Sequence, residues 1–174
     1  MSVAEAVNVK RGFMSSGAQQ IEQKLQDLGI VLPETPKPVA SYLPCTVSGN
    51  LAFVSGQLPS QAGRIVYLGK VPTALSMEDG ILAARMAVIN ALAVLKNVAL
   101  GGDWRNFVSV VRVGVFVQSD DNFYEQPKVA NGASDLLAEI FGQPGRHARA
   151  AVGVNALPLN AAVEVELTAE ILRV

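Results

Sequence analysis

The sequence has 174 residues, of which 50% are hydrophobic and 17% are charged, and its formal net charge is -1. A chain of this length makes one ordinary domain, which buries roughly 70% of the surface that the unfolded chain exposes. A net charge this close to zero gives no global positive field, so nucleic acid is disfavoured as a partner.

The same counts exclude several other classes of protein. No apolar run approaches the roughly 20 residues of a membrane helix, and the N-terminus lacks the long hydrophobic segment of a signal peptide. A single cysteine, Cys45, excludes an internal disulfide, and one cysteine with one histidine makes no zinc cluster. We therefore expect a cytoplasmic protein with no metal and no membrane partner. The apolar composition suggests contacts between copies of the chain.

The first part of the chain is expected to lie outside the main domain. Its initial residues show no periodicity and predict a leader, after which Ser15 or Ser16 can cap a helix that Gly29 ends. The stretch "VLPETPKPVASYLP" cannot sustain a helix and predicts an extended linker. We therefore divide the chain into residues 1–40, with the leader, helix and linker, and residues 41–174, which form the domain.

The domain begins with two β-prone runs in "CTVSGNLAFVSGQLP", and Gly49-Asn50 between them favours a tight hairpin. The next run, "GRIVYLGKV", predicts a third strand. Ser76, with Asp79 three residues later, is typical of a capping box. It begins a long alanine-rich helix that the glycine pair at 101–102 ends.

The second half of the domain predicts one strand, one helix and two more strands. "FVSVVRVGVFVQ" indicates a buried strand, and a helix should run from near Pro127 to Gly142. "ARAAVGVNALPLNAAVEVELTAEI" then predicts two strands folded into a hairpin around Leu157-Pro158. The order of elements predicts an α+β fold of two layers, in which two long helices cover one face of a mixed six-stranded sheet and an extra helix precedes them.

Alternation along the last two strands predicts which side chains leave the core. With a hairpin centred on Pro158, Gly153 pairs with Glu164, and Arg149 lies on the same face roughly 13 Å further along the strand. Such a face, lined by small and polar groups, suggests a contact surface between subunits. The residues expected to face the helices are Val152, Val154, Val163, Val165 and Leu167, and those expected to face away are Arg149, Ala151, Gly153, Glu164, Glu166 and Thr168.

Arg149 and Glu164 can be interpreted in two ways. An arginine presents a planar fork that holds a carboxylate through two hydrogen bonds, and a glutamate in a partly dry cleft can position or deprotonate a water. Alternatively, Arg149 is solvated at a strand end and Glu164 is satisfied by a neighbouring charge. Composition and periodicity leave both interpretations open. His147, which shares a face with Arg149, is interpreted as part of a solvated strand entry.

Several motifs occur together from about Tyr42 to the C-terminus. They are a tyrosine in a proline-rich approach, a Ser-Gly-Gln strand end, an arginine, and a Leu-Pro turn before a Val-Glu-x-Glu strand. This combination resembles the signature of the YjgF/YER057c/UK114 group, also called the Rid family of reactive-intermediate deaminases. Some members of the family are labelled endoribonuclease L-PSP. The matching positions are Tyr42, Ser55-Gly56-Gln57, Arg149, Leu157-Pro158 and Val163-Glu164.

The resemblance implies a chorismate-mutase-like fold and a homotrimer with clefts between subunits. In the family's active branch the arginine binds the carboxylate of a 2-imino acid or its enamine tautomer. The glutamate orients the water that releases ammonia and leaves a 2-keto acid, and no metal or organic cofactor is required. By position, Arg149 would hold the substrate carboxylate and Glu164 would orient the water. The residues expected to contact the substrate are Tyr42, Ser55, Gly56 and Ala151.

Two features depart from the family's pattern. Ala151 stands where the deaminase branch often has a cysteine, and the N-terminal helix and linker resemble a longer subgroup of the family. Two functions therefore stay open: a deaminase, which is a hydrolase acting on C=N bonds, and a non-catalytic trimeric protein that binds small carboxylates through Arg149. An endoribonuclease fits poorly with the net charge of -1 and with the lack of a basic, aromatic-rich patch.

Overall fold

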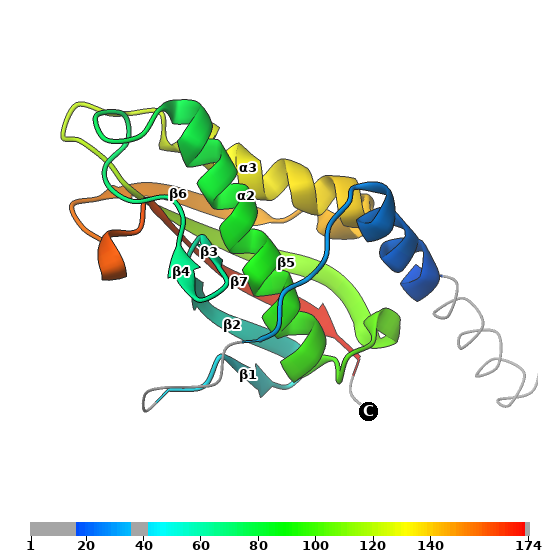
Figure 1. Cartoon of the computed structure of the whole chain (residues 1–174). Helices are drawn as coiled ribbons and strands as arrows, with labels where there is room; N and C mark the ends of the chain where they lie inside the picture. The colour runs from blue at the N-terminus through cyan, green and yellow to red at the C-terminus, as the bar shows by residue number, and fades with distance from the viewer. Residues whose placement is uncertain (1–16, 36–41, 173–174) are drawn as a thin grey trace, which may run out of the picture.

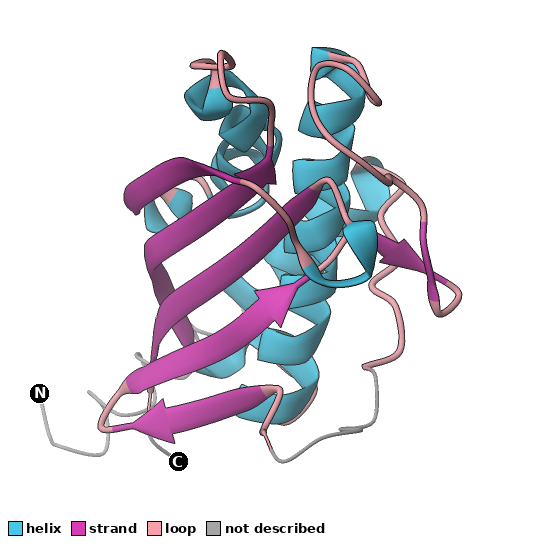
Figure 2. Ribbon diagram, turned by 90° about the vertical axis from the view of Figure 1, so that its left-hand side faces the viewer, coloured by secondary structure: helices cyan, strands magenta, loops and turns pink. Residues whose placement is uncertain are grey.

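The computed structural model describes residues 17–35 and 42–172, and its main feature is a five-stranded sheet with helices on one face. α2 (Met77–Val94) and α3 (Gln126–Phe141) lie side by side across that face (Figure 1). In Figure 2 these helices lie behind the sheet, and no helix of the described residues covers its other side, the open face. The α+β fold of two layers is therefore confirmed. The sheet has the order β1-β2-β7-β5-β6, with β1 (Cys45–Ser48), β2 (Leu51–Gln57), β5 (Phe107–Gln118), β6 (Ala148–Val154) and β7 (Val163–Ile171).

The sixth strand of the expected sheet is not there. The expected third strand, residues 63–71, makes only β4 (Arg64–Ile65), which pairs with β3 (Ser60–Gln61) in a separate two-stranded hairpin. It cannot pair with the preceding strand of the sheet, β2, because β1 and β7 already occupy both edges of that strand. The rest of this segment touches the fold through isolated bridges at Leu68 and Val71.

Helix α2 begins and ends as the sequence predicts. The hydroxyl of Ser76 accepts a hydrogen bond from the backbone N–H of Asp79 (3.0 Å), and the Asp79 carboxylate accepts one from the Ser76 N–H (3.1 Å). A π-helical turn (Leu95–Ala99) continues α2, and Gly101 follows with a positive φ of 67°. Contrary to the expectation that no apolar run approaches the length of a membrane helix, the segment Met77–Ala99 is long and apolar enough to cross a membrane. In this fold it is the core helix, mostly buried inside the molecule.

The apolar core lies between the helices and the sheet. Pro127 stands in the first turn of α3 and Gly142, with φ 64°, ends it, as expected. Trp104 anchors the loop before β5, because its ring is 2% exposed and packs edge-on against Phe107 and Phe141. Fully buried valines and leucines from both layers fill the centre: Val88, Leu92, Val113, Val115, Val117, Leu136, Leu137, Val163, Val165 and Leu167.

The last two strands do not form the expected hairpin. β5 lies between them, parallel to β6 and antiparallel to β7. The connection crosses over the end of β5, where Gln118 accepts a hydrogen bond from the backbone N–H of Leu157 (2.9 Å) and donates one to the side chain of Asn160 (2.8 Å). Leu159 and Asn160 turn the chain with positive φ angles of 55° and 59°. A buried glutamine on a distant strand therefore decides the path that the Leu-Pro motif takes.

The N-terminal helix, over residues 17–27, packs outside the two layers. Leu25 is 3% exposed in the main core, and Glu22 forms an ion pair with Lys96 of the π-helical turn (2.5 Å). Gly29 follows the helix with a positive φ of 64°, as its predicted end requires. The leader and the capping serines lie outside the described residues, as does the boundary near residue 40.

Candidate functional site

Glu164 lies on the open face of the sheet. It is paired with Phe116 of β5, and its carboxylate sits over Gly56 of β2, where an added Cβ would come within 1.8 Å of its Oε1 atom. Burial raises the pKa of Glu164, and the nearby charge of Glu166 raises it further. No hydrogen bond or ion pair joins Glu164 to another described residue, whereas Glu166 is paired with Arg112 (2.7 Å).

A β-bulge places Ser55 and Gly56 beside Glu164. β2 and β7 pair regularly up to Val54, but β2 has one extra residue before Gln57 resumes the pairing. Bulges of this kind redirect side chains and are common next to active sites. The Ser55 hydroxyl donates to the backbone carbonyl of Leu43 (2.7 Å), so the segment that carries the exposed Tyr42 is attached here. The structure thus brings together Ser55, Gly56 and Glu164, with Tyr42 on the adjoining segment.

Arg149 lies on the opposite face of the sheet, which contradicts the predicted arrangement. It is paired with Val113, a fully buried residue of the helix-facing side, and its guanidinium reaches α3. There it donates to the side-chain carbonyl of Asn131 (2.9 Å) and to the hydroxyl of Ser134 (3.1 Å). No carboxylate of the described residues forms an ion pair with it.

The error arises from the valines of β6. Alternation suggested that Val152 faces the helices, but it is 45% exposed and paired with Phe116 on the open face. Ala151 and Gly153 point toward the helices instead, and an added Cβ on Gly153 would touch Gln126 of α3. Because β6 is an edge strand, its apolar side chains need not face the core of their own chain.

His147 belongs to the same group of side chains as Arg149. Its Nδ1 is 2.6 Å from the carbonyl oxygen of Gly145, and its Nε2 is 3.0 Å from the hydroxyl of Ser134. A carbonyl only accepts, so Nδ1 donates to Gly145, and Nε2 shares a hydrogen bond with the Ser134 hydroxyl. Ser134 in turn accepts from Arg149. His147 thus lies half-buried at the entry to β6, and both of its ring nitrogens have partners.

Asn131 and Ser134 were missed by the sequence reasoning. They are three residues apart on α3 and therefore lie on one side of the helix, among alanines and leucines. A polar pair at this spacing is the signal that could have found them. Ser134, Asp135, His147 and Arg149 also line a shallow cavity of about 290 Å³.

The candidate residues form two half-sites in one chain. The first, at β2 and β7, contains Ser55, Gly56 and Glu164, and the second, at β6 and α3, contains Arg149 and Ala151. β5 separates the two strands, so the half-sites are roughly 10 Å apart across the sheet and open on opposite faces. A small molecule cannot touch Arg149 and Glu164 of the same copy at once. Within residues 17–35 and 42–172, no group of three or more His, Cys, Asp or Glu side chains is arranged to hold a metal ion.

Comparison with known proteins gives consistent similarities. Residues 22–171 match the family described as "YjgF/chorismate mutase-like, putative endoribonuclease". Protein TCP17 of Trypanosoma cruzi is 40% identical over 153 residues, which cover 87% of this chain and 94% of that protein. The 2-iminobutanoate/2-iminopropanoate deaminase of Dermatophagoides farinae is 31% identical over 137 residues, covering 79% of this chain and 91% of that protein.

Solved structures resemble the fold over most of its length. The crystal structure of the protein Atu1372 from Agrobacterium tumefaciens has a TM-score of 0.83 and 42% identity, and covers 91% of this chain and 96% of that chain. The YjgF gene product of E. coli has a TM-score of 0.57 and 22% identity, and covers 79% of this chain and 93% of that chain. The second likeness concerns the fold alone.

Proposed function

Because this chain belongs to the YjgF/chorismate-mutase-like family, we propose that it hydrolyses small 2-imino acids, or their enamine tautomers, to 2-keto acids and ammonia. One observation carries the proposal: Arg149 is held in place by the neutral side chains of Asn131 and Ser134 and has no described carboxylate partner. Its positive charge is therefore available for the carboxylate of a substrate. The deaminase relative from Dermatophagoides farinae supports the same reaction.

In the proposed mechanism Arg149 binds the substrate carboxylate and Glu164 orients a water toward the C=N carbon. The raised pKa of Glu164 makes it a stronger base than an ordinary surface carboxylate, so it can take a proton from that water as the C–O bond forms. Addition of this hydroxide to the protonated imine gives a carbinolamine, and Glu164 returns its proton to the amino nitrogen. The C–N bond then breaks and ammonia leaves, while the hydroxyl proton passes back to the Glu164 carboxylate as the C=O bond forms. Water supplies the oxygen of the 2-keto acid, so the reaction balances without an oxidant.

Two copies of the chain are needed to complete this site. Arg149 lies at the free edge of the sheet, on the helix side, whereas Glu164 lies on the open face. We therefore place the substrate between the Arg149 half-site of one copy and the Glu164 half-site of the next, in a cyclic homotrimer. Tyr42, which is 57% exposed, would close the cleft. Phe53 and Val152, 41% and 45% exposed on the open face, would be covered by the neighbouring copies.

Mixing two inactive variants tests both the chemistry and the shared site. Arg149→Ala lacks the carboxylate anchor, and Glu164→Gln should still bind a 2-keto acid but turn over slowly. When the two are unfolded, mixed in equal amounts and refolded together, random assortment pairs an intact Arg149 with an intact Glu164 in about one site of four. We expect roughly a quarter of the wild-type rate of 2-keto acid release from 2-iminobutanoate.

Each variant refolded alone serves as the control. No recovery in the mixture, with a wild-type enzyme that is active and refolds, would reject the shared site but keep the reaction. A wild-type protein that does not accelerate hydrolysis of 2-iminopropanoate or 2-iminobutanoate would reject the reaction for these substrates. If that protein still binds 2-ketobutyrate through Arg149, the alternative function of a non-catalytic carboxylate binder is favoured.

A further inference from the structure

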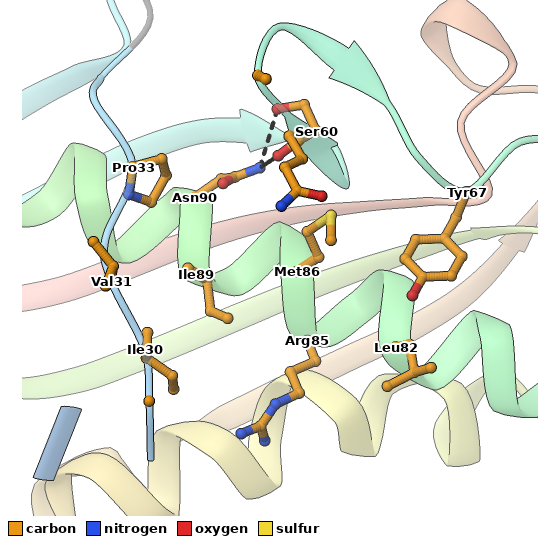
Figure 3. A pocket seen from close by; sticks show the side chains of 13 residues that line it. Ile30, Val31, Pro33, Ser60, Tyr67, Leu82, Arg85, Met86, Ile89 and Asn90 are labelled. Carbon is orange, nitrogen blue, oxygen red and sulfur yellow. Dashed lines mark hydrogen bonds between the residues drawn. The ribbon is translucent and has the colours of Figure 1, made fainter. Parts of the chain in front are cut away.

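A second cavity lies on the outer side of α2, away from both half-sites, and we call it the outer pocket. It has a volume of about 330 Å³, within the range of roughly 300–1,000 Å³ that is usual for small-molecule sites. Three segments far apart in the sequence line it: residues 29–33 after the N-terminal helix, the β3–β4 hairpin with Tyr67, and the outer side of α2. In Figure 3, Arg85, Met86 and Ile89 project from α2 between Ile30 and Val31 on one side and Tyr67 on the other.

Hydrogen bonds fix the walls of the outer pocket. Asn90 of α2 is 7% exposed and donates to the backbone carbonyls of Leu58 (2.8 Å) and Ser60 (3.0 Å), and also approaches the Ser60 hydroxyl (3.1 Å). On the other wall, the backbone N–H of Ile30 donates to the backbone carbonyl of Leu25 (2.8 Å), and the side chain of Leu25 lies in the core. Because the buried side-chain amide of Asn90 donates its hydrogen bonds to Leu58 and Ser60, this wall of the pocket has a defined shape.

Arg85 gives the outer pocket its charge. Among the described residues that line the pocket, it is the one arginine or lysine, and none of them is an aspartate or a glutamate. No hydrogen bond or ion pair joins Arg85 to another described residue, and it is half-buried on α2. A guanidinium in this state can offer its planar fork to an acid group.

The rest of the lining is mainly apolar. Met86 and Ile89 form the floor beside Arg85, and the ring of Tyr67 closes one side. Two further lining side chains are apolar but exposed to solvent: Val31 is 88% exposed and Leu82 is 48% exposed. A ligand with an apolar body would cover this surface and gain free energy in proportion to the area buried.

We propose that the outer pocket binds a small amphipathic carboxylate, with its acid group on Arg85 and its apolar or aromatic body against Met86, Ile89 and Tyr67. Among the described lining residues there is a single guanidinium with no lysine and no helix N-terminus beside it, which matches one negative charge better than the two charges of a phosphate. The pocket shares no lining residue with the half-sites of Arg149 and Glu164. The inference therefore stands independently of the proposed deaminase reaction.

Calorimetric titration of the full-length protein tests this inference with hydrocinnamate and its neutral amide, hydrocinnamamide. We expect wild-type protein to bind the acid at least about tenfold more tightly than the amide, because only the acid forms charge-assisted hydrogen bonds with Arg85. Arg85→Gln should remove this preference. Arg105→Gln, which neutralises an exposed arginine that does not line this pocket, is the matched control and should keep it.

A second pair of variants tests the position of the ligand without touching the core. Val31→Asp adds a negative charge at an exposed site of the pocket wall and should weaken hydrocinnamate binding about tenfold, whereas Val31→Asn should not. The inference is wrong if the acid shows no saturable binding with a Kd below about 10 mM. It is equally wrong if Arg85→Gln binds the acid as wild type does, or if Arg149→Gln alone abolishes binding.

Discussion

Glu164 and Arg149 carry opposite charges, and neither has a counterion among the described residues, but their surroundings differ. Glu164 is half-buried beside a second acid, Glu166, so that its surroundings oppose its charge and raise its pKa. Arg149 is exposed at the sheet edge, and neutral groups from α3 hold its guanidinium without reducing its charge. By contrast, Arg112 and Glu166 on the open face neutralise each other.

This difference assigns a separate task to each half-site. A carboxylate whose surroundings oppose its charge accepts a proton readily, which suits work on a water molecule. A guanidinium held by hydrogen bonds to uncharged side chains keeps its full charge and a defined orientation, which suits binding an anion. The chain therefore carries a base and an anchor on opposite faces, and the following variants test whether each task belongs to its residue.

The largest effect is expected at Arg149. Arg149→Ala should lower kcat/KM for 2-iminobutanoate by about 10²- to 10³-fold, because the substrate loses a charge-assisted, two-point contact. Arg149→Lys should recover only part of this loss, since an ammonium cannot present the same fork. Steady-state rates of 2-keto acid release measure both. Arg64→Ala, which removes an exposed arginine on β4, is the control, and an equal loss there would show a general charge effect.

A methyl group at Gly56 should displace the base without removing it. In Gly56→Ala the new Cβ would meet the Glu164 carboxylate at 1.8 Å, so this side chain must move away from the water that it orients. We expect kcat to fall about 10- to 100-fold with KM less affected. Gly114→Ala crowds Glu166 in the same way (2.6 Å) and is the matched control. Comparable losses of kcat in both variants would contradict the special role of Glu164.

A substitution at Ser134 tests whether substrate binding by Arg149 depends on the hydrogen bonds that hold its guanidinium. Ser134→Ala removes one hydrogen bond to Arg149 and the hydroxyl that His147 contacts, but it leaves Asn131 in place. We expect KM to rise about three- to tenfold while kcat changes little, because Arg149 loses one of the two neutral hydrogen-bond partners that hold it in place to bind the substrate. Asp135→Ala changes the next residue, which lines the same cavity, and should not raise KM. A drop in kcat with an unchanged KM would assign Ser134 to the chemical step instead.

The smallest expected effect concerns stability. The pKa of Glu164 is raised in the folded protein, so its contribution to stability is present at low pH and is lost as the pH rises through that pKa. Glu164→Gln removes an unfavourable charge and should raise the Tm at pH 7 by a few degrees. Below about pH 4, where the glutamate is protonated in both states, the gain should vanish. Thermal unfolding followed by circular dichroism measures it, and a lower Tm at pH 7 would show that a counterion holds Glu164.

The elements themselves could be predicted because their signals are local. The capping box at Ser76, the positive φ angles of Gly49 and Gly142, and the continuous apolar run of β5 depend on neighbouring residues alone. The residue types of the candidate site could also be recognised, since the Arg149-to-Glu164 motif is a linear pattern. The chain's membership in the YjgF/chorismate-mutase-like family agrees with that recognition.

The faces on which Arg149 and Glu164 lie were decided by tertiary structure. A strand's alternation distinguishes two sides but does not say which one meets the core when both carry apolar residues, as in β6. β5 separates β6 from β7, Gln118 turns the connecting loop, and a bulge moves Gly56 under Glu164. Each of these depends on pairing between residues distant in sequence, so the order of amino acids determined what the elements and candidate groups are, and only their packing decided where those groups meet.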